Sequence, residues 1–356
     1  MSWTRTFWNI AAEPLRWSRC YHPRLNPSDP RILIIRRNRM GDMIYTLPLL
    51  HALRRHFPKA HLTMVCDPPG APIARACPAV NEVIVLQSGW NPWQALMKNA
   101  AVLQEYDWVI AAKGGFDRRL AVLARLTNAV VRIGFERHAD RDSAYYTDPV
   151  ALPPNPHDEH QIETLLRLLK PLGLVQPTEY TVDLGLIIPE TSRVFAAGVL
   201  AQAPFIPSRP FVLINLSSTV RLKFREEDFI GLMRWILATT ELAIGLVGVP
   251  ADQQKAVEIA HCMASNRIVA VETPGPLDLA ALLQHAVCLI TPEGGAAHLA
   301  AVVNTPAIVL WSEGPFKKWY SRGPGHVFVH AKAGEKSIPP ERVWQALQPI
   351  LEAKAR

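Results

Sequence analysis

The sequence lacks several features that would assign the protein to a class at once. No run in its 356 residues approaches the roughly 20 apolar residues of a membrane span. The segment Met1–Cys20 is interrupted by charges, so we expect no signal peptide. Five cysteines are scattered with no CxxC pair, which indicates neither a disulfide framework nor a zinc site. We therefore expect a cytoplasmic protein with free thiols.

Two further absences narrow the chemistry. No GxGxxG follows the first apolar strand pattern, which argues against a dehydrogenase. A DxD at 140–142 does not follow an apolar strand, and the His-Asp-Glu-His run at 157–160 opens a helix after a Pro-rich turn. We expect neither of these two segments to bind a metal, and we predict no metal site and no cofactor.

The chain has an excess of positive charge. It carries 38 Lys and Arg against 31 Asp and Glu, for a formal charge of +7. That excess favours an anionic partner such as nucleic acid, a membrane surface or a phosphorylated substrate. The arginines recur inside segments that read as folded, with no low-complexity basic tail. We therefore expect a binding site or a membrane-facing surface, and no nucleic-acid partner.

Apolar runs of strand length alternate with helical patterns from Arg31 onward. In the first half we expect strands at 32–35, 61–66, 82–86, 108–112 and 130–134, separated by helices at 42–56, 92–104 and 118–126. Strands that are apolar on both faces and alternate with helices are typical of a parallel sheet covered on two sides.

The pattern restarts near residue 211. Here we expect strands at 211–215, 242–247, 287–291 and 307–310, interleaved with helices at 226–239, 251–264, 277–285 and 296–303. The sequence thus predicts an α/β protein with two Rossmann-like, doubly wound parallel-sheet domains that face each other across a cleft.

The expected division of the chain has four parts. They are an amphipathic N-terminal extension at 1–30, a first domain at 31–187, a second domain at 188–335 and a C-terminal helix at 336–356, which we expect to pack back toward the first domain. The extension interleaves Trp and Arg in a helical stripe that Pro14 interrupts. Such a stripe is typical of a helix at a membrane interface and also of a helix docked on the second domain, and both interpretations stay open.

Gly41 and Asp42 stand where the first strand pattern gives way to a helix. A glycine permits a tight turn, and the helix dipole favours a carboxylate in the first helical turn. We expect Asp42 to be ionised at neutral pH and to accept a proton from a hydroxyl held against it. The alternative is an ordinary aspartate at a helix start.

A second motif follows the strand pattern at 287–291. Two glycines and a helix of small residues come next, and bare backbone N–H groups at such a helix start bind phosphate. We expect Glu293 to bind sugar hydroxyls there, and His298 to be either a buried residue or a ligand contact. The expected phosphate cradle consists of Gly294, Gly295, Ala296 and Ala297.

Two more polar loops follow strand ends. In the second half, hydroxyls and cations in one loop suit binding of a diphosphate. In the first half, the cations suit binding of an anionic acceptor. A solvated polar surface is the alternative for both loops. The residues are Ser217, Ser218, Thr219, Arg221 and Lys223 in the second half, and Lys113, Arg118, Arg119 and Arg137 in the first.

Several of these segments together resemble a known family. RILIIRRNRMGDMIYTLPLLHALRRHFPKAHLTMV resembles the opening of the ADP-heptose:lipopolysaccharide heptosyltransferases, glycosyltransferase family nine. YDWVIAAKGG, VVRIGFER and LAALLQHAVCLITPEGGAAHLAAVVNTPAIVLW are similar to its later motifs, in the same order. The resemblance implies a GT-B fold that binds the acceptor on the N-terminal domain and the donor on the C-terminal domain. It also implies an inverting, metal-independent transfer of heptose from ADP-heptose to the lipopolysaccharide core.

The resemblance also implies roles for single residues. Asp42 matches the family's general base, and Glu293 stands where the family usually has Asp. The family's phosphate-binding Lys precedes a Trp-Pro pair that is absent from RLKFREEDF, so Lys223 is expected in its place, with Arg221 as a substitute. Lys113 stands where the family usually has Gln. Acceptor binding is expected at Arg39, Met40, Gly41, Lys113, Arg118, Arg119 and Arg137.

The resemblance implies partners as well. They are a nucleotide sugar as donor and an anionic, lipid-linked oligosaccharide as acceptor. We expect a cytoplasmic monomer that lies peripherally on the inner membrane. Two alternatives stay open. One is a sugar-nucleotide epimerase on the same scaffold, and the other is a non-catalytic protein that binds nucleotide or glycan.

Overall fold

The protein is described by a computed structural model that covers residues 29–37, 39–87, 105–127, 129–137, 145–174, 184–205, 209–217, 224–335 and 337–355. The chain divides into two compact units, residues 1–184 and 185–356. Most of the expected N-terminal extension, the helix expected at 92–104 and the DxD at 140–142 lie outside the described residues.

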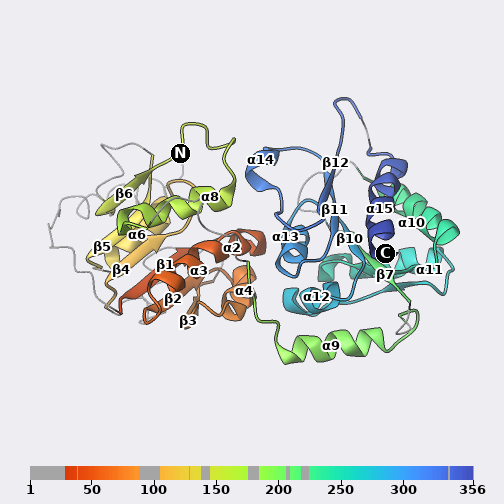
Figure 1. Ribbon diagram of the computed structural model, residues 1–356, viewed down its shortest axis with the longest axis horizontal. Coiled ribbons are helices and arrows are strands. Elements are labelled where there is room, and N and C mark those ends of the chain that lie inside the picture. The colour runs from red at the N-terminus through yellow and green to blue at the C-terminus, as the bar shows by residue number, and fades with distance from the viewer. Residues whose placement is uncertain are drawn as a thin grey trace. The chain divides into compact units, whose positions relative to one another are not determined.

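Unit 1 is built on a parallel sheet in the order β3-β2-β1-β4-β5-β6 (Figure 1). Its first and fourth strands are neighbours, and Ile35 pairs with Ala111 in the register. The carboxyl ends of these two strands form the topological switch point, where open α/β sheets bind their ligands. The strands are β1 (Arg31–Arg36), β2 (His61–Cys66), β3 (Glu82–Val85), β4 (Trp108–Ala111), β5 (Val131–Glu136) and β6 (Asp148–Ala151).

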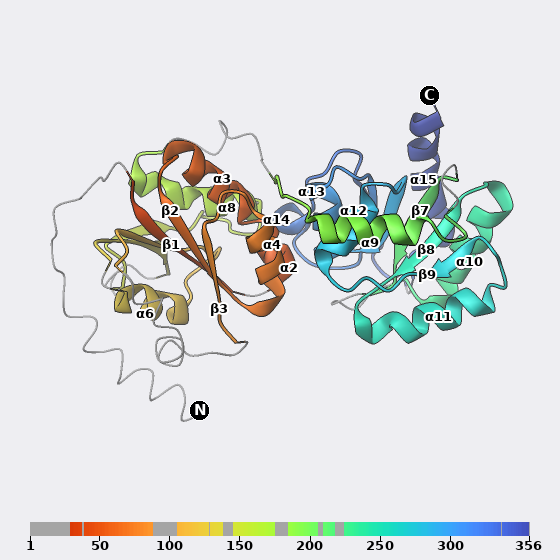
Figure 2. The ribbon, with the colours of Figure 1, turned by 90° about the horizontal axis from the view of Figure 1, so that it is seen from below.

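Helices cover both faces of this sheet, with α6 on one side and α3 and α8 on the other (Figure 2). The single helix expected at 42–56 is instead two helices, separated by Tyr45 and Thr46. Pro48 has no N–H to donate to the carbonyl of Ile44, so the first helix ends there. The helices are α2 (Met40–Ile44), α3 (Leu47–His56), α4 (Ala71–Ala76), α6 (Arg118–Leu126) and α8 (Gln161–Leu166), with 3-10 turns at Pro68–Gly70 and Arg167–Leu172.

Unit 2 repeats the winding, with the strand order β12-β11-β10-β7-β8-β9. The fold prediction of two doubly wound parallel sheets is therefore confirmed. Sequence reasoning missed β6, β9 and β12, which are edge strands of three or four residues and pair on one side only. The strands are β7 (Phe211–Asn215), β8 (Ala243–Val247), β9 (Ile268–Ala270), β10 (Cys288–Pro292), β11 (Ala307–Trp311) and β12 (Val327–His330).

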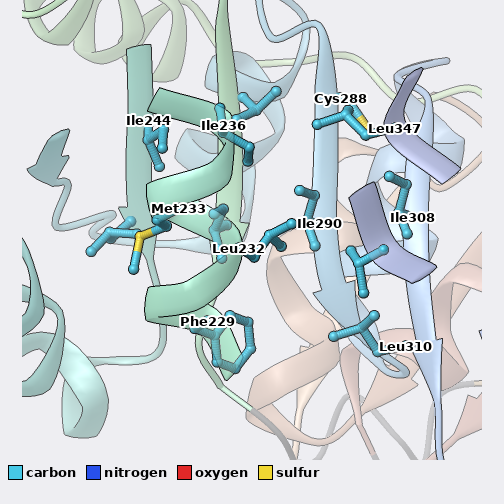
Figure 3. Packing of buried hydrophobic residues seen from close by; sticks show 14 of the residues in the cluster. Phe229, Leu232, Met233, Ile236, Ile244, Cys288, Ile290, Ile308, Leu310 and Leu347 are labelled. Atoms are coloured by element: carbon cyan, nitrogen blue, oxygen red, sulfur yellow. The ribbon is translucent and has the colours of Figure 1, made fainter. Parts of the chain in front are cut away.

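The core of unit 2 forms because α10 (Glu226–Thr239) presents apolar residues at helical spacing. Phe229, Leu232, Met233 and Ile236 lie on one face of it and are buried against the sheet (Figure 3). The helix α11 (Gln253–Cys262) covers the same face of the sheet. The unit also contains α9 (Glu190–Leu200), α12 (Pro276–Leu283), α13 (Gly295–Val302), α14 (Phe316–Trp319) and a 3-10 turn at Pro250–Asp252.

The C-terminal helix α15 (Pro340–Ala355) joins this core. Val343 and Leu347 are fully buried in it, and Trp344 stacks on Trp235 of α10 with ring centroids 6.1 Å apart. The apolar face of α15 is thus buried within unit 2, and its packing toward the first domain stays a prediction. No helix among the described residues is long and apolar enough to span a membrane.

We predict that Val212→Ala lowers the free energy of unfolding by about 2–3 kcal/mol, because it removes buried methyl groups and leaves a cavity. Val212 is 0% exposed in this core, whereas Val257 of α11 is 52% exposed. Val257→Ala is therefore the matched control, with an expected change below about 0.5 kcal/mol. Urea unfolding measures both, and equal effects of the two substitutions would contradict this account of the core.

Candidate functional site

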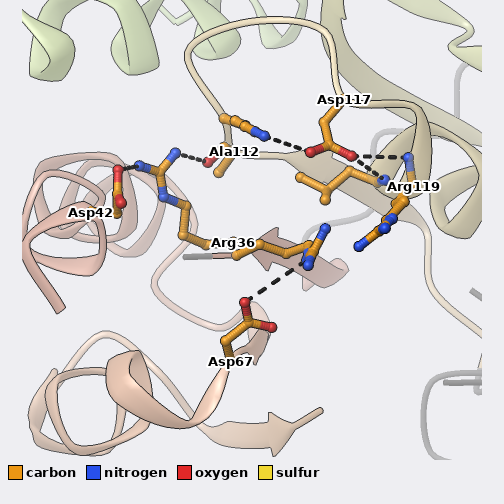
Figure 4. A network of polar contacts seen from close by, with 9 residues as sticks. Arg36, Asp42, Asp67, Ala112, Asp117 and Arg119 are labelled. Atoms are coloured by element: carbon orange, nitrogen blue, oxygen red, sulfur yellow. Dashed lines mark hydrogen bonds and ion pairs between the residues drawn. The ribbon is translucent and has the colours of Figure 1, made fainter. Parts of the chain in front are cut away.

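The switch point of unit 1 contains a buried arginine. Arg36, the last residue of β1, is 2% exposed. Its Nη1 donates to the carbonyl oxygen of Ala112, which follows β4, at 2.7 Å, and its Nη2 donates to Oδ1 of Asp42 (Figure 4). Burial lowers the pKa of Arg36, and the charge of Asp42 and the hydrogen bond to it oppose that shift. The guanidinium thus joins both strand ends of the switch point to one carboxylate.

Asp42 occupies the first turn of α2, as the sequence predicts. Its side chain is 19% exposed. Oδ2 accepts the backbone N–H of Arg39 at 3.3 Å, while Oδ1 is held by Arg36. Asp42 therefore serves the helix start, which was the alternative interpretation, and also forms a fixed ion pair. The second oxygen bears only one long hydrogen bond among the described residues, so it can accept another donor.

A second ion pair lies in the loop after β4. Lys113 Nζ contacts Asp117 Oδ2 at 2.5 Å, and Asp117 Oδ1 accepts the backbone N–H groups of Arg119 and Leu120 at the start of α6 (Figure 4). Burial acts to raise the pKa of Asp117, but the hydrogen bond and charge of Lys113, the Leu120 backbone N–H and the charge of Arg37 together lower it below its usual value. Lys113 is thus anchored and still 34% exposed.

The other residues expected to bind an acceptor lie at the same edge of the sheet. Arg39 is exposed and precedes α2, in which Met40 and Gly41 are partly exposed. Arg118 and Arg119 open α6, and Arg137 directly follows β5 and is exposed. Sequence reasoning missed Arg36, because the sequence does not show which arginine of the Arg36-Arg37 pair is buried.

In unit 2, the corresponding strand ends are joined by a hydrogen bond between neutral groups. Asn215 at the end of β7 donates from Nδ2 to Oγ1 of Thr291 in β10 at 2.9 Å. The predicted donor residue Ser217 donates to Asp252 at 2.5 Å and accepts the backbone N–H of Val249 at 2.8 Å. Its hydroxyl therefore shapes this loop, and its contact with a donor stays a prediction. Ser218, Thr219, Arg221 and Lys223 lie outside the described residues.

The glycine pair after β10 forms the turn that the sequence predicts. Gly294 has φ 146° and ψ −162°, a conformation essentially restricted to glycine. The helix α13 begins at Gly295, and the N–H groups of its first turn have no partner within the helix. Such groups suit an anion. His298 is buried in α13, with 8% of its surface exposed.

Glu293 lies directly before this turn and is partly buried. Burial raises its pKa to about 7, although the backbone N–H groups of Glu313 and Ser312 lower it. Its Oε1 is buried and has no hydrogen-bond partner in the described part of the chain. Near neutral pH this carboxyl group can therefore donate or accept a hydrogen bond, which suits a neutral hydroxyl.

The His-Asp-Glu-His segment at 157–160 does not form a metal site among the described residues, which hold no cluster of three or more His, Cys, Asp or Glu that could bind an ion. His160 instead accepts the backbone N–H of Ile162 at the start of α8, and Glu159 pairs with Arg167. Both side chains thus stabilise local structure. The DxD at 140–142 lies outside the described residues. Metal independence of the chemistry stays a prediction.

Comparison with known proteins identifies a family. The pattern of glycosyltransferase family 9 (heptosyltransferase) matches residues 95–336, more than half of the chain. The chain is 25% identical over 351 residues to lipopolysaccharide heptosyltransferase 3 of Escherichia coli K12, covering 88% of this chain and 96% of the relative. The family match confirms the predicted resemblance.

Solved structures share the fold. A family 9 glycosyltransferase from Veillonella parvula has a TM-score of 0.80 at 20% identity, covering 93% of this chain and 100% of its own. An Escherichia coli heptosyltransferase with ADP-2-deoxy-2-fluoro heptose has a TM-score of 0.69 at 22% identity, covering 90% and 99%. The fold, with two six-stranded parallel sheets each covered by helices, is thus of the GT-B type.

We predict that Glu293→Gln stabilises the protein at pH 8 and not at pH 5. The raised pKa of Glu293 contributes stability that is present below about pH 4.5 and is lost as the pH rises through about 7. Glutamine stays neutral at both pH values, so the substitution removes this loss. The pKa shift corresponds to about 3 kcal/mol of unfolding free energy, and solvent screening of this half-buried side chain reduces the expected gain to about 1–2 kcal/mol. Unfolding by urea at both pH values measures the difference. Glu272→Gln at an exposed position is the control, and a gain independent of pH would contradict the assignment.

Proposed function

Because the chain belongs to glycosyltransferase family 9, the heptosyltransferases, we propose that it transfers heptose, or a related sugar, from an ADP-sugar to the lipopolysaccharide core. The observation that carries the proposal is the Asp42 carboxylate, which Arg36 holds at the switch point of unit 1. The names of the relatives support the sugar class, since one is a lipopolysaccharide heptosyltransferase and another was solved with an ADP-heptose analogue.

Asp42 acts as the general base in this proposal. An acceptor hydroxyl donates to Oδ2, and its proton passes to the carboxylate as the oxygen attacks the anomeric carbon. The new carbon–oxygen bond forms while the bond to the diphosphate breaks, so the configuration inverts and ADP leaves. A carboxylate is a weak base for a sugar hydroxyl, so the rate depends on fixed geometry. The second hydrogen bond of Arg36, to Ala112, supplies that geometry.

The acceptor's anionic groups are bound by the cations around Asp42. Lys113 lies in the loop after β4, Arg119 lies in the first turn of α6, and Arg39 precedes α2. All three are at least partly exposed. The positive charge of the chain favours a peripheral position on the inner membrane, where a lipid-linked acceptor resides.

The donor diphosphate is bound in unit 2. The first turn of α13 offers backbone N–H groups to phosphate oxygens, and Lys223 or Arg221 adds a cation, so departing charge is stabilised with no need of a metal. Glu293 binds a sugar hydroxyl. A carboxyl group with a pKa of about 7 suits a neutral partner better than an anionic one.

Mass spectrometry tests the function directly. We expect the full chain to convert ADP-heptose and a deacylated lipopolysaccharide core into a product heavier by one heptose. A panel of other nucleotide sugars defines the donor. Release of an altered sugar without any acceptor would indicate an epimerase, and binding of ADP-heptose without turnover on any core would indicate a non-catalytic protein.

We predict that Asp42→Ala and Asp42→Asn lower transfer by at least about 100-fold and leave ADP-heptose affinity nearly unchanged. Asp228 is a matched control, because it stands at the same position of α10 and accepts the backbone N–H of Arg225 at 2.6 Å. Asp228→Asn should lower the melting temperature and spare the rate. If both substitutions to Asn lower only stability, Asp42 is a capping residue and not the base.

We predict that Arg36→Lys lowers kcat by about 10- to 100-fold while the KM for the donor stays constant. A lysine ammonium cannot reproduce the planar fork that binds Asp42 and the Ala112 carbonyl together. Arg54→Lys is the control, since Arg54 binds the carbonyl oxygens of Ala60 and Ala79 away from Asp42. It should reduce thermal stability alone, and an equal loss of kcat in both variants would contradict a specific role for Arg36.

A further inference from the structure

Unit 1 contains a buried glutamine that serves neither the core nor the ion pairs described above. Gln161 is the first residue of α8 and is 0% exposed. Neither its Oε1 nor its Nε2 has a hydrogen-bond partner in the described part of the chain. Burial of an amide without partners is costly, and an apolar residue of the same size avoids that cost. A glutamine here therefore requires a reason other than stability.

The amide of Gln161 lies at the switch point. It packs against Gly114 in the turn after β4, where a Cβ would stand 2.1 Å from Nε2 and 2.5 Å from Oε1. Two residues earlier, the carbonyl of Ala112 accepts the hydrogen bond from Arg36. Gly114 thus connects the unpartnered amide to the strand end that positions Asp42.

A ring contact of the preceding residue places the start of α8 near α2. The ring of His160, its neighbour in the chain, meets the ring of Tyr45 edge-on at a centroid distance of 5.6 Å. Tyr45 follows the last residue of α2, the helix that carries Asp42. The start of α8, which carries Gln161, therefore lies near the end of the helix of Asp42, while the amide itself contacts the turn after β4.

We propose that Gln161 is a specificity-determining residue that binds hydroxyls of the acceptor sugar beside the one that Asp42 deprotonates. This inference rests on the proposed function. An amide offers two donors and an acceptor without charge, which suits a pair of neighbouring sugar hydroxyls. Lys113 and the arginines bind the anionic groups of the acceptor, so different residues bind its neutral hydroxyls and its charged groups.

The turn at Gly114 covers the amide, and its displacement would expose the amide to a ligand. Lys113, Gly114 and Gly115 are all partly exposed, so this turn lies between Gln161 and solvent. Two short-range backbone hydrogen bonds define the turn, from Lys113 N to the Ala111 oxygen and from Gly115 N to the Lys113 oxygen. Acceptor binding in this proposal requires a displacement of Gly114 that uncovers the amide. An acceptor that binds there replaces the contact with Gly114 by hydrogen bonds.

Gln161→Met tests the proposal, because methionine has nearly the same size and no amide. We expect the melting temperature to rise by about 2 °C or more, as a buried unpartnered amide is removed. We expect kcat/KM for the deacylated core acceptor to fall by about 10- to 100-fold, with the KM for ADP-heptose unchanged. Gln284→Met, at an exposed position, is the control and should alter none of these values.

A pair of glycine variants tests the contact without changing Gln161. Gly114→Ala places a Cβ against the amide, whereas a Cβ at Gly115 meets no atom within 4 Å. We expect Gly114→Ala to reduce kcat/KM for the acceptor by about 10-fold or more and Gly115→Ala to leave it unchanged.

The outcomes separate this inference from the proposed function. A lower melting temperature of Gln161→Met with unchanged acceptor kinetics would assign Gln161 a structural role and overturn the inference alone. A wild-type chain that neither transfers sugar to any core acceptor nor binds one by calorimetry would overturn both proposals. Both proposals are supported if the wild-type chain transfers sugar and kcat/KM for the acceptor falls only in Gln161→Met and Gly114→Ala.

Discussion

The structure of unit 1 depends on a guanidinium that is taken out of water at the end of β1. Burial of an arginine is costly unless its charge is paired and hydrogen bonds replace those it made to water. Asp42 supplies the charge and the Ala112 carbonyl supplies a second acceptor. The start of α2 and the end of β4 are therefore fixed relative to β1 by one side chain. Any group that reacts at Asp42 meets a carboxylate whose orientation is already set.

The two units share one construction with different chemistry. In each, a polar side chain at the end of the first strand bonds across the switch point to the fourth strand or the residue after it. The bond in unit 1 involves Arg36 and is charged, whereas that in unit 2 joins Asn215 to Thr291 and is neutral. The charged version positions a carboxylate that can accept a proton. The neutral version holds a glycine turn whose backbone N–H groups suit an anion.

Unsatisfied polar atoms gather at these same places. Arg36, Gln161 and Glu293 each keep a buried side-chain nitrogen or oxygen without a hydrogen-bond partner in the described part of the chain. Folded proteins contain few such atoms, and those that persist concentrate where function overrides stability. All three residues lie beside a switch point, and in the proposed function a bound substrate offsets this cost by hydrogen-bonding Gln161 and Glu293.

The sequence by itself determined the two doubly wound sheets, the carboxylate at the start of α2 and the glycine turn before α13. These are local features, since apolar runs, a Gly-Asp pair and a Gly-Gly pair act on their own few residues. Only the tertiary structure decided that Arg36 binds Asp42 and Ala112, that Ser217 is engaged by Asp252, and that Gln161 lies on Gly114. Arg36 and Ala112 are 76 residues apart, and Ser217 and Asp252 are 35 apart. Such pairs form because the parallel winding brings distant strand ends to one edge, a consequence that no single segment encodes.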